Sequence, residues 1–438
     1  MKKIKNRAFA ALLLAILVVG GLGVYVVRLY NDGGEWITFR ANQTIYQSGE
    51  LKTGTIYDRN GVALISYDDD NGRTYASDPV VRASCLHAVG DLAGNIGTGA
   101  VTAFSDKLVG YDLVSGLTNK SSSELYLTID SRINAAAYNA LNGRKGAVIV
   151  YNYKNGDIIC MASSPSYDPM NVPDLTSDFY DGVYLNRCIS STYTPGSIFK
   201  IVTLAAAIEN LDDLYTRSFW CPGSVDVNGV TIKCSGIHGT QTIEQAFANS
   251  CNCAFADLAL DLGADTIGKY AKQLGLLDNL KFDGIETAAG RYDKDADGSP
   301  GLAWSGIGQY NDLVSPYAMM RAVGAIAGGG KTVEPHVLLD SSGGSTTLLK
   351  ADTADKLRDF MSYNVVNTYG TWNFPGLSLC AKSGTAEVGD GTSHAWFVGF
   401  LEDEEHPYAF AVVVEHGGGG LSVAGSVANT VLQEAVKY

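Results

Sequence analysis

A run of twenty residues without a charged side chain, Ala8 to Val27, is the feature that most constrains this chain. Four basic residues precede the run and Arg28 ends it. Twenty helical residues span about 30 Å, the thickness of the hydrocarbon core of a bilayer. The run therefore predicts a membrane-spanning helix. The excess of basic residues before it predicts a cytoplasmic tip and an extracytoplasmic remainder.

The alternative is a cleaved signal peptide, which has a shorter apolar region and a small-x-small cleavage site. The run ends Val24-Tyr-Val-Val-Arg28 and has no such site, so we expect an uncleaved anchor in the cell membrane. The net charge is −14, and no basic cluster follows residue 7. This argues against nucleic acid as a partner, because phosphate binding needs a positive surface.

Asn-Gly dipeptides between strand-like runs are the strongest short hairpin signal. Three of them predict hairpins here, at Asn60-Gly61, Asn155-Gly156 and Asn228-Gly229. We expect helices over 131–141, 197–208, 243–262, 353–363 and 426–436, and late strands over 377–382, 395–400 and 408–415. Strands at both ends with helices between them predict an α+β domain whose sheet joins chain-distant strands.

Stretches rich in glycine and serine suggest the domain boundaries. Gly33-Gly34 and the segment 118–123 divide the chain into a cytoplasmic tip with anchor (1–30), a small N-terminal module (31–123) and a large domain (124–438).

No metal and no cofactor is expected. Residues 293–298 match the opening of a calcium loop, but Trp304 stands where a bidentate Glu is needed. The eight cysteines show no Cys-x-x-Cys spacing, and Cys85, Cys160, Cys188 and Cys380 are expected to be small buried residues.

Three short motifs, about 50 and 130 residues apart, carry chemistry when taken together. In Ser197-Ile-Phe-Lys200, one helical turn brings an amine within reach of a hydroxyl nucleophile. In Ser250-Cys251-Asn252, a tight turn would aim a hydroxyl and an amide at one cleft. The third motif comprises Lys382, Ser383, Gly384 and Thr385, which would grip a carboxylate at the end of an apolar strand.

This set, in this order, resembles class B penicillin-binding proteins, the monofunctional D,D-transpeptidases. Further similarity lies in Gly54–Gly61, Pro195–Lys200, Gly306–Gln309 and His394–Gly399. The resemblance implies a transpeptidase fold, like that of serine β-lactamases, with an antiparallel sheet between helices. It also implies peptidoglycan stem peptides ending in D-Ala-D-Ala as substrates, β-lactams as acylating agents, and a glycosyltransferase as partner.

The resemblance also implies the role of each residue. Ser197 attacks the penultimate D-Ala, Lys200 acts as its general base, and Ser250 passes the proton to the leaving amine. Asn252 holds the substrate amide, while Lys382, Ser383 and Thr385 bind the terminal carboxylate. The backbone N–H groups of Ser197 and Thr385 form the oxyanion hole.

Some features depart from the family pattern, and alternatives stay open. Cys251 is an unusual middle residue, the N-terminal module is short, and no glycosyltransferase-sized domain precedes the transpeptidase, so polymerisation is not expected. A D,D-carboxypeptidase or a non-enzymatic β-lactam sensor would share the acylation step. A β-lactamase is disfavoured by the anchor. The sequence does not distinguish division, elongation or sporulation.

A disulfide between Cys221 and Cys234 is a further hypothesis. Strict pairing about Asn228-Gly229 sets Cys221 opposite Gly236 and Cys234 opposite Gly223, as diagonal neighbours about 7–8 Å apart. A bulge at Pro222-Gly223 would bring the sulfurs together. Two separate thiols are the alternative.

Overall fold

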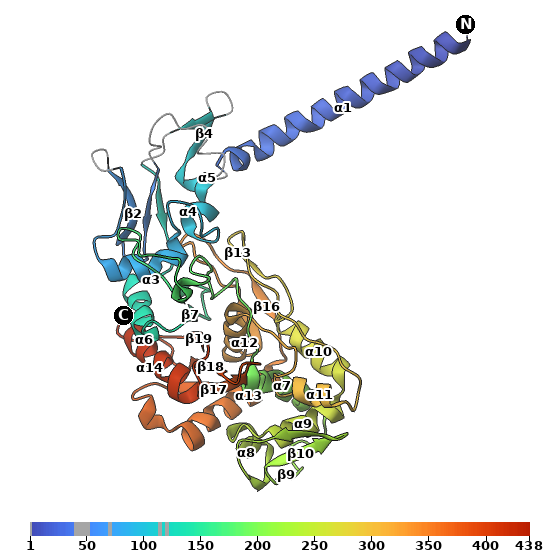
Figure 1. The fold of residues 1–438 in the computed structure, drawn as a ribbon, viewed down its shortest axis with the longest axis vertical. Coiled ribbons are helices and arrows are strands. Elements are labelled where there is room, and N and C mark those ends of the chain that lie inside the picture. The colour runs from blue at the N-terminus through green and yellow to red at the C-terminus, as the bar shows by residue number, and fades with distance from the viewer. Residues whose placement is uncertain (1, 39–52, 69–71, 113–115, 119–121) are drawn as a thin grey trace.

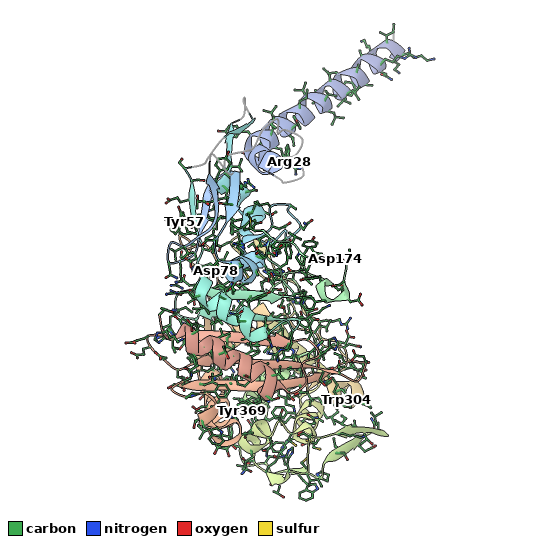
Figure 2. All side chains as sticks on the ribbon, turned by 60° about the vertical axis from the view of Figure 1, so that its left-hand side comes forward. Arg28, Tyr57, Asp78, Asp174, Trp304 and Tyr369 are labelled. Carbon is green, nitrogen blue, oxygen red and sulfur yellow. The ribbon has the colours of Figure 1, made fainter. Side chains whose placement is uncertain are left out.

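A long N-terminal helix projects from the rest of the chain in the computed structural model, which describes residues 2–38, 53–68, 72–112, 116–118 and 122–438 (Figure 1). This helix is α1 (Lys2–Thr38), and its side chains radiate outward with nothing packed on them over most of its length (Figure 2). Among the described residues it is the one helix long and apolar enough to cross a membrane, over Lys2–Gly34. The helix contains the predicted span and continues through Gly33-Gly34.

A four-stranded sheet with strand order β3-β2-β1-β6 forms the N-terminal module. The expected Asn60-Gly61 hairpin is confirmed, because it joins β1 to β2. The boundary expected at 118–123 lies partly outside the described residues, and β6, which follows it, still pairs with β1 of the module. The elements of the module are β1 (Thr55–Tyr57), β2 (Ala63–Asp68), β3 (Gly72–Tyr75), α3 (Pro79–Val89), α4 (Ala100–Ala103), α5 (Ser105–Leu108), β4 (Gly110–Asp112), β5 (Gly116–Thr118) and β6 (Glu124–Tyr126).

The buried carboxylate of Asp58 joins this module to the large domain. It accepts hydrogen bonds from the Ser131 hydroxyl at 2.7 Å and from the Ser131 backbone N–H at 3.2 Å. Ser131 opens α6 (Ser131–Leu141), so the carboxylate also faces the positive end of that helix. Beside it, Asn60 Nδ2 donates to Asp130 at 2.9 Å. The segment 54–61 therefore fixes the module against α6.

The centre of the large domain is a five-stranded antiparallel sheet with strand order β17-β18-β19-β7-β8. The Asn155-Gly156 hairpin joins β7 to β8, as predicted, and the late strand β19 pairs with the early strand β7. Sequence reasoning ended the first of the late strands at Lys382, but β17 continues to Glu387. The strands are β7 (Gly146–Asn152), β8 (Ile158–Ser164), β17 (Leu379–Glu387), β18 (Ser393–Leu401) and β19 (Tyr408–Val414).

Helices cover both faces of this sheet, so β7 is apolar from Ala147 to Tyr151 on both of its faces. Val148 and Val150 point to the face covered by α6 and α14 (Ser426–Ala435). Ile149 points to the opposite face, where α12 (Pro316–Ala327) packs on β7, β18 and β19. The predicted α+β sandwich is confirmed.

The remaining elements complete the domain around α12 and below it in Figure 1. They are η1 (Asp178–Tyr180), η2 (Gly196–Phe199), α7 (Lys200–Asn210), β9 (Phe219–Cys221), β10 (Ser224–Val227), β11 (Val230–Lys233), β12 (Gly239–Gln241), α8 (Ile243–Ala248), α9 (Asn252–Leu262), α10 (Ala264–Gln273), β13 (Lys281–Phe282), β14 (Ile285–Glu286), α11 (Pro300–Ser305), β15 (Lys331–Val333), β16 (Ser345–Thr347), α13 (Ala351–Asn364), η3 (Val365–Tyr369), η4 (Thr371–Asn373) and η5 (Gly420–Gly425).

The third hairpin forms as predicted, but the register expected for Cys221 is wrong. Val227 pairs with Val230 about Asn228-Gly229, and the Cys234 N–H donates to the Gly223 carbonyl at 2.9 Å. The hairpin ladder ends at Ser224, and Cys221 lies in β9, opposite Gly239 of β12. Gly223, with φ of +100°, turns the chain from one ribbon to the other. All eight cysteines are free thiols in the structure, so the Cys221–Cys234 bridge is not formed.

Candidate active site

Ser197 lies in a short 3-10 turn, η2, that leads directly into α7. The turn begins at Gly196, whose φ of +55° favours glycine and whose N–H donates to the Gly308 carbonyl at 2.8 Å. One turn later, Lys200 Nζ lies 3.1 Å from Ser197 Oγ. The spacing of the first motif therefore does place the amine at the hydroxyl, and Ser197 is partly exposed while Lys200 is fully buried.

The second motif occupies a break between two helices. A single helix was expected over 243–262, but α8 ends at Ala248 and α9 begins at Asn252. Ser250 takes a left-handed conformation with φ of +52°. Lys200 Nζ donates to the Ser250 carbonyl at 2.6 Å and to Asn252 Oδ1 at 2.7 Å, and it lies 3.3 Å from Ser250 Oγ. The buried ammonium thus finds its acceptors in the turn that replaces the helix.

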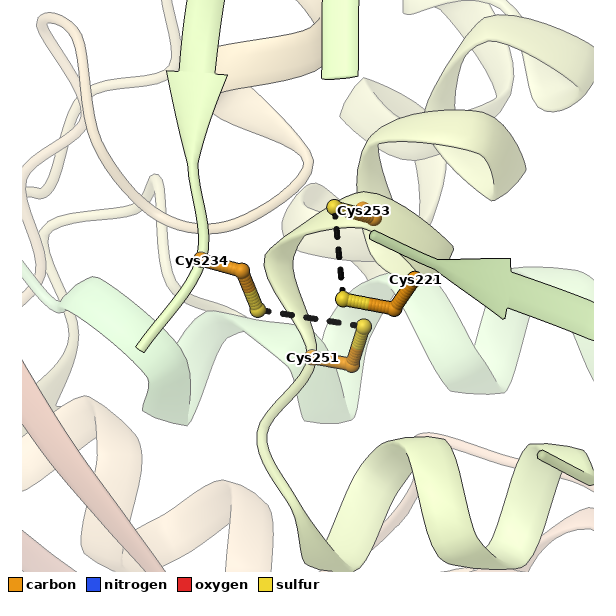
Figure 3. Close-up of side chains that lie close together, drawn as sticks. All are labelled: Cys221, Cys234, Cys251 and Cys253. Carbon is orange, nitrogen blue, oxygen red and sulfur yellow. Dashed lines mark hydrogen bonds between the residues drawn. The ribbon is translucent and has the colours of Figure 1, made fainter. Parts of the chain in front are cut away.

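Asn252 is oriented by a bond on its other side. Its Nδ2 donates to the Lys233 carbonyl at 2.8 Å, which leaves Oδ1 for Lys200. The sulfur of Cys251 is buried and lies 3.9 Å from Cys234 Sγ (Figure 3). The unusual middle residue of the motif is therefore outside the cleft.

The third motif lies within β17, not after it, and its side chains alternate between two surroundings. Lys382 is fully buried, and its Nζ lies 3.0 Å from Ser250 Oγ and 2.9 Å from the Ser383 carbonyl. Ser383 points the other way, to the Tyr369 hydroxyl at 3.1 Å. Thr385 Oγ1 accepts the N–H of Gly420 at 3.2 Å. All three motifs therefore meet at the hydroxyl of Ser250.

Gly384 allows η2 to lie against β17. A Cβ at this position would stand 3.0 Å from the Pro195 carbonyl oxygen and 3.0 Å from Ile198 Cγ2. Both neighbours flank Ser197 in the chain. Trp396, opposite Gly384 on β18, fixes the same turn because its Nε1 donates to the Thr194 carbonyl at 3.0 Å.

Burial lowers the pKa of both lysines. The pKa of Lys200 falls to about 8, because the ammonium loses its hydration, although nearby cysteines raise it in part. Burial lowers the pKa of Lys382 well below its usual value, and the charge of Lys200 lowers it further. Neither lysine pairs with a carboxylate among the described residues. The site therefore increases the fraction of neutral amine beside Ser197 above that of an exposed lysine.

Two cavities open onto the motifs and share Thr385. One, of about 310 Å³, is lined by Ser197, Thr231, Lys233, Asn252, Trp304, Ile307, Gln309, Thr385 and Glu387. The other, of about 680 Å³, is lined by Asn373, Phe374, Ser383, Thr385, Gly419, Gly420, Leu421, Ser422, Gly425, Ser426 and Asn429. Tyr369, labelled with Trp304 in Figure 2, holds Ser383 because its hydroxyl bonds to both the backbone N–H and the hydroxyl of that serine. Together the cavities form a cleft that runs from Ser197 along β17.

Sequence reasoning missed Tyr369, Trp304 and the η5 residues as parts of this site. Tyr369 ends a π-helical turn after α13, and no short motif surrounds it. In the 293–298 loop, Asp297 Oδ1 accepts the Ala264 N–H at the start of α10 at 2.9 Å.

A family model for the penicillin-binding protein transpeptidase domain matches residues 146–433 of the chain. The chain belongs to this family. The match begins at β7 and ends in α14, so it covers the whole five-stranded sheet and the three motifs.

Relatives and solved structures agree with this membership. The peptidoglycan D,D-transpeptidase PbpA of Mycobacterium tuberculosis is 29% identical over 350 residues, 70% of each chain. A structure from Eggerthella lenta, described as the D,D-transpeptidase domain of a peptidoglycan glycosyltransferase, has a TM-score of 0.77. It is 28% identical and covers 89% of this chain and 99% of that one. The imipenem acyl-enzyme of M. tuberculosis penicillin-binding protein A has a TM-score of 0.76 at 25% identity, covering 88% and 99%.

The resemblance inferred from the motifs is thereby confirmed in family, fold and enzyme class. The chain is a class B penicillin-binding protein, a serine-type D,D-transpeptidase.

Proposed function

We propose that this chain cross-links peptidoglycan by transferring a stem peptide through an acyl-enzyme on Ser197. The observation that carries the proposal is one hydrogen-bonded network. Lys200 Nζ reaches Ser197 Oγ and Ser250 Oγ, and Lys382 Nζ reaches the same Ser250 hydroxyl. A hydroxyl nucleophile, a buried amine and a proton relay thus stand together in one cleft.

In the acylation step, neutral Lys200 accepts the Ser197 proton as Oγ attacks the carbonyl of the penultimate D-Ala. The bond to the terminal D-Ala then breaks, and its leaving amine takes a proton from Ser250, which regains one from Lys200. The 3.1 Å and 3.3 Å separations support this route, as does the pKa of Lys200, lowered to about 8. Lys200 ends the step neutral and ready to activate the acceptor amine.

The substrate carboxylate is assigned to the third motif. The Ser383 and Thr385 hydroxyls line the larger cavity, and Lys382 lies behind them as a buried cation. An arriving carboxylate raises the pKa of Lys382 by direct attraction and keeps it charged. Lys200 then remains the neutral partner, so the two lysines divide the roles of base and anchor.

The oxyanion hole is assigned to the backbone N–H groups of Ser197 and Thr385. These groups lie on two elements that Gly196 and Gly384 allow to approach closely, since a Cβ on Gly196 would stand 2.8 Å from the Thr385 carbonyl oxygen. Fixed N–H dipoles aimed at a developing oxyanion are an effective form of transition-state stabilisation. Asn252 lines the same cavity as Ser197 and Thr385, and we assign it to the substrate amide.

Helix α1 is assigned as a single-pass anchor that leaves the transpeptidase outside the cell. The four basic residues before the apolar run support this orientation. Cross-linking needs polymerised glycan strands, so we assign a glycosyltransferase as the partner in the same membrane.

Intact mass after incubation with penicillin tests the nucleophile. The wild type should gain one penicillin, Ser197→Ala should gain none, and Ser422→Ala, a serine of the same cleft, should still gain one. Labelling of Ser197→Ala at the wild-type rate would remove the assignment. Incubation with donor and acceptor stem peptides then separates cross-linked product, expected here, from simple loss of D-Ala by hydrolysis.

A further inference from the structure

Four of the eight cysteines converge beside the second motif (Figure 3). Cys221 ends β9, Cys234 follows β11, Cys251 precedes α9, and Cys253 lies in its first turn. Their sulfur atoms all lie within 4.8 Å of one another. Cys221 Sγ is 3.5 Å from Cys253 Sγ, and Cys234 Sγ is 3.9 Å from Cys251 Sγ. The cluster brings together two β-ribbons and the start of a helix.

We propose that these four cysteines bind one zinc ion in a structural tetrathiolate site. Zinc in such a site takes four sulfurs at about 2.3 Å in a tetrahedron, which sets them about 3.8 Å apart. The two close pairs, at 3.5 Å and 3.9 Å, lie on either side of that value. A disulfide would need about 2.05 Å, so both pairs would have to close by about 1.5 Å or more. Two disulfides also give no reason for all four sulfurs to be mutual neighbours.

Burial and nearby donors fit a closed metal site. Cys221, Cys251 and Cys253 are at most 4% exposed, and Cys234 is partly exposed. The Asn252 N–H donates to Cys234 Sγ at 3.2 Å, and His238 Nδ1 lies 3.6 Å from the same sulfur. Such outer contacts orient the sulfur ligands of metal sites. Ile237, three residues after Cys234, is exposed, so the Cys234 side of the cluster is the one near solvent.

The local fold has a physical need for such a link. The β9–β12 and β10–β11 ribbons are separate two-stranded sheets outside the central sheet. A two-stranded ribbon is at best marginally stable alone. Cys221 lies on the first ribbon, Cys234 follows the second, and Cys251 and Cys253 belong to the start of α9. One ion would therefore tie both ribbons to the helix that carries Asn252. Its binding releases the four thiol protons and leaves a tetrathiolate centre of net charge −2.

The site would also hold the second catalytic motif, and this step rests on the proposed function. Cys251 and Cys253 flank Asn252, whose Oδ1 accepts from Lys200 at 2.7 Å. The carbonyl accepting from Asn252 Nδ2 belongs to Lys233, the residue before Cys234. An ion bound by these cysteines fixes both ends of that contact. Removing it should let the Ser250–Asn252 turn move and slow acylation.

The test begins with the metal content of the full chain, purified in detergent without chelator. We expect about one zinc per chain by mass spectrometry. Cys253→Ser and Cys221→Ser should lose most of it, while Cys160→Ala, another fully buried cysteine, should keep it. Wild-type protein stripped of zinc and titrated with Co²⁺ should saturate at one ion with tetrahedral thiolate spectra. X-ray absorption of the zinc form should show four sulfurs at about 2.3 Å.

These measurements can overturn the site without any variant. Failure of the reduced wild type to bind either ion would do so. So would disulfides between Cys221 and Cys253 and between Cys234 and Cys251 in peptide maps of freshly purified protein, or fewer than three sulfur ligands.

The rate of acylation by penicillin is measured separately from the metal content. Chelation should lower the penicillin acylation rate by at least tenfold, and added zinc should restore it. An unchanged rate refutes the link to the Ser250–Asn252 turn, whereas zinc bound by a chain that is never acylated refutes the proposed function instead.

Discussion

The pH dependence of acylation is set by the burial of Lys200. An exposed lysine is neutral in only about 0.03% of molecules at pH 7, because its pKa is near 10.5. With the pKa lowered to about 8, about 10% of the amines are neutral at pH 7 and about 1% at pH 6. If the neutral amine accepts the Ser197 proton, the acylation rate should rise almost tenfold from pH 6 to pH 7. The rise should level off above pH 8.

Stopped-flow measurement of the second-order rate constant for acylation by a chromogenic β-lactam, from pH 6 to pH 9.5, tests this profile. Lys200→Arg keeps a positive charge but gives no neutral base, so it should lower the rate by about 10²–10⁴-fold at every pH. A rate that is constant between pH 6 and pH 8, or a Lys200→Arg rate near that of the wild type, would refute the reasoning.

Asn252→Asp gives a second arm of the same test. It places a carboxylate where Oδ1 lies 2.7 Å from Lys200 Nζ, and an adjacent opposite charge favours the ammonium by about 1–3 pKa units. The rising part of the pH–rate profile should move to higher pH by that amount, and much of the acylation rate should be recovered at alkaline pH. If the variant is slower but the midpoint of its pH–rate profile stays near pH 8, Asn252 acts on the substrate and not on Lys200.

Three further predictions concern packing, stability and topology. Gly384→Ala should lower the free energy of unfolding by about 1–3 kcal/mol in denaturant titrations, because its Cβ meets Pro195 and Ile198 at 3.0 Å. Gly389→Ala, whose Cβ meets nothing within 4 Å, should change it by less than about 1 kcal/mol, and equal losses in both variants would contradict this. Burial lowers the pKa of His87 to about 4, below the unfolded value near 6.5, so stability is complete above pH 6.5 and falls as pH drops toward 4, by about 3 kcal/mol in all. His87→Gln should remove that part of the pH dependence of the melting temperature, and an unchanged slope would refute it. Protease added to intact protoplasts should digest the large domain, whereas its survival would mean the opposite orientation.

Local signals in the sequence predicted most of the sandwich. The Asn-Gly pairs at 60, 155 and 228 each lie at a hairpin, and the glycine of each pair takes a positive φ angle that few other residues adopt. The helix expected over 131–141 is present as α6. It could be predicted because Asp130 caps it and it has one apolar face. The order of the three motifs identified the family, although each motif alone is common.

Contacts between distant segments were beyond local reasoning. Cys221, Cys234, Cys251 and Cys253 are separated by 13, 17 and 2 positions, a spacing with no familiar metal pattern. They meet because Gly223 turns the chain from the β9–β12 ribbon to the β10–β11 ribbon. Counting residue pairs outward from the Asn228-Gly229 turn in strict register did not allow for this change of ribbon. Tyr369 reaches Ser383 from a π-helical turn, which has no sequence signature of its own.

The break in the helix predicted over 243–262 is explained by the hydrogen bonds that Lys200 makes to Ser250 and Asn252. Residues two apart on an α-helix point about 200° away from each other. Ser250 and Asn252 in one continuous helix could not both face Lys200 Nζ, whereas in the structure the Ser250 carbonyl and Asn252 Oδ1 both accept from it. The break places Ser250 at φ of +52°, which costs about 1 kcal/mol or more in a residue with a side chain. Such strain persists only where neighbouring contacts fix it. Three contacts fix the turn here. The Cys251 N–H donates to the Ala246 carbonyl of α8 at 2.8 Å, the Lys200 ammonium donates to the turn, and the cysteine cluster lies behind it. The strained serine is also the one whose hydroxyl joins both lysines, so the backbone conformation that the sequence disfavours is the one on which the proposed proton relay depends.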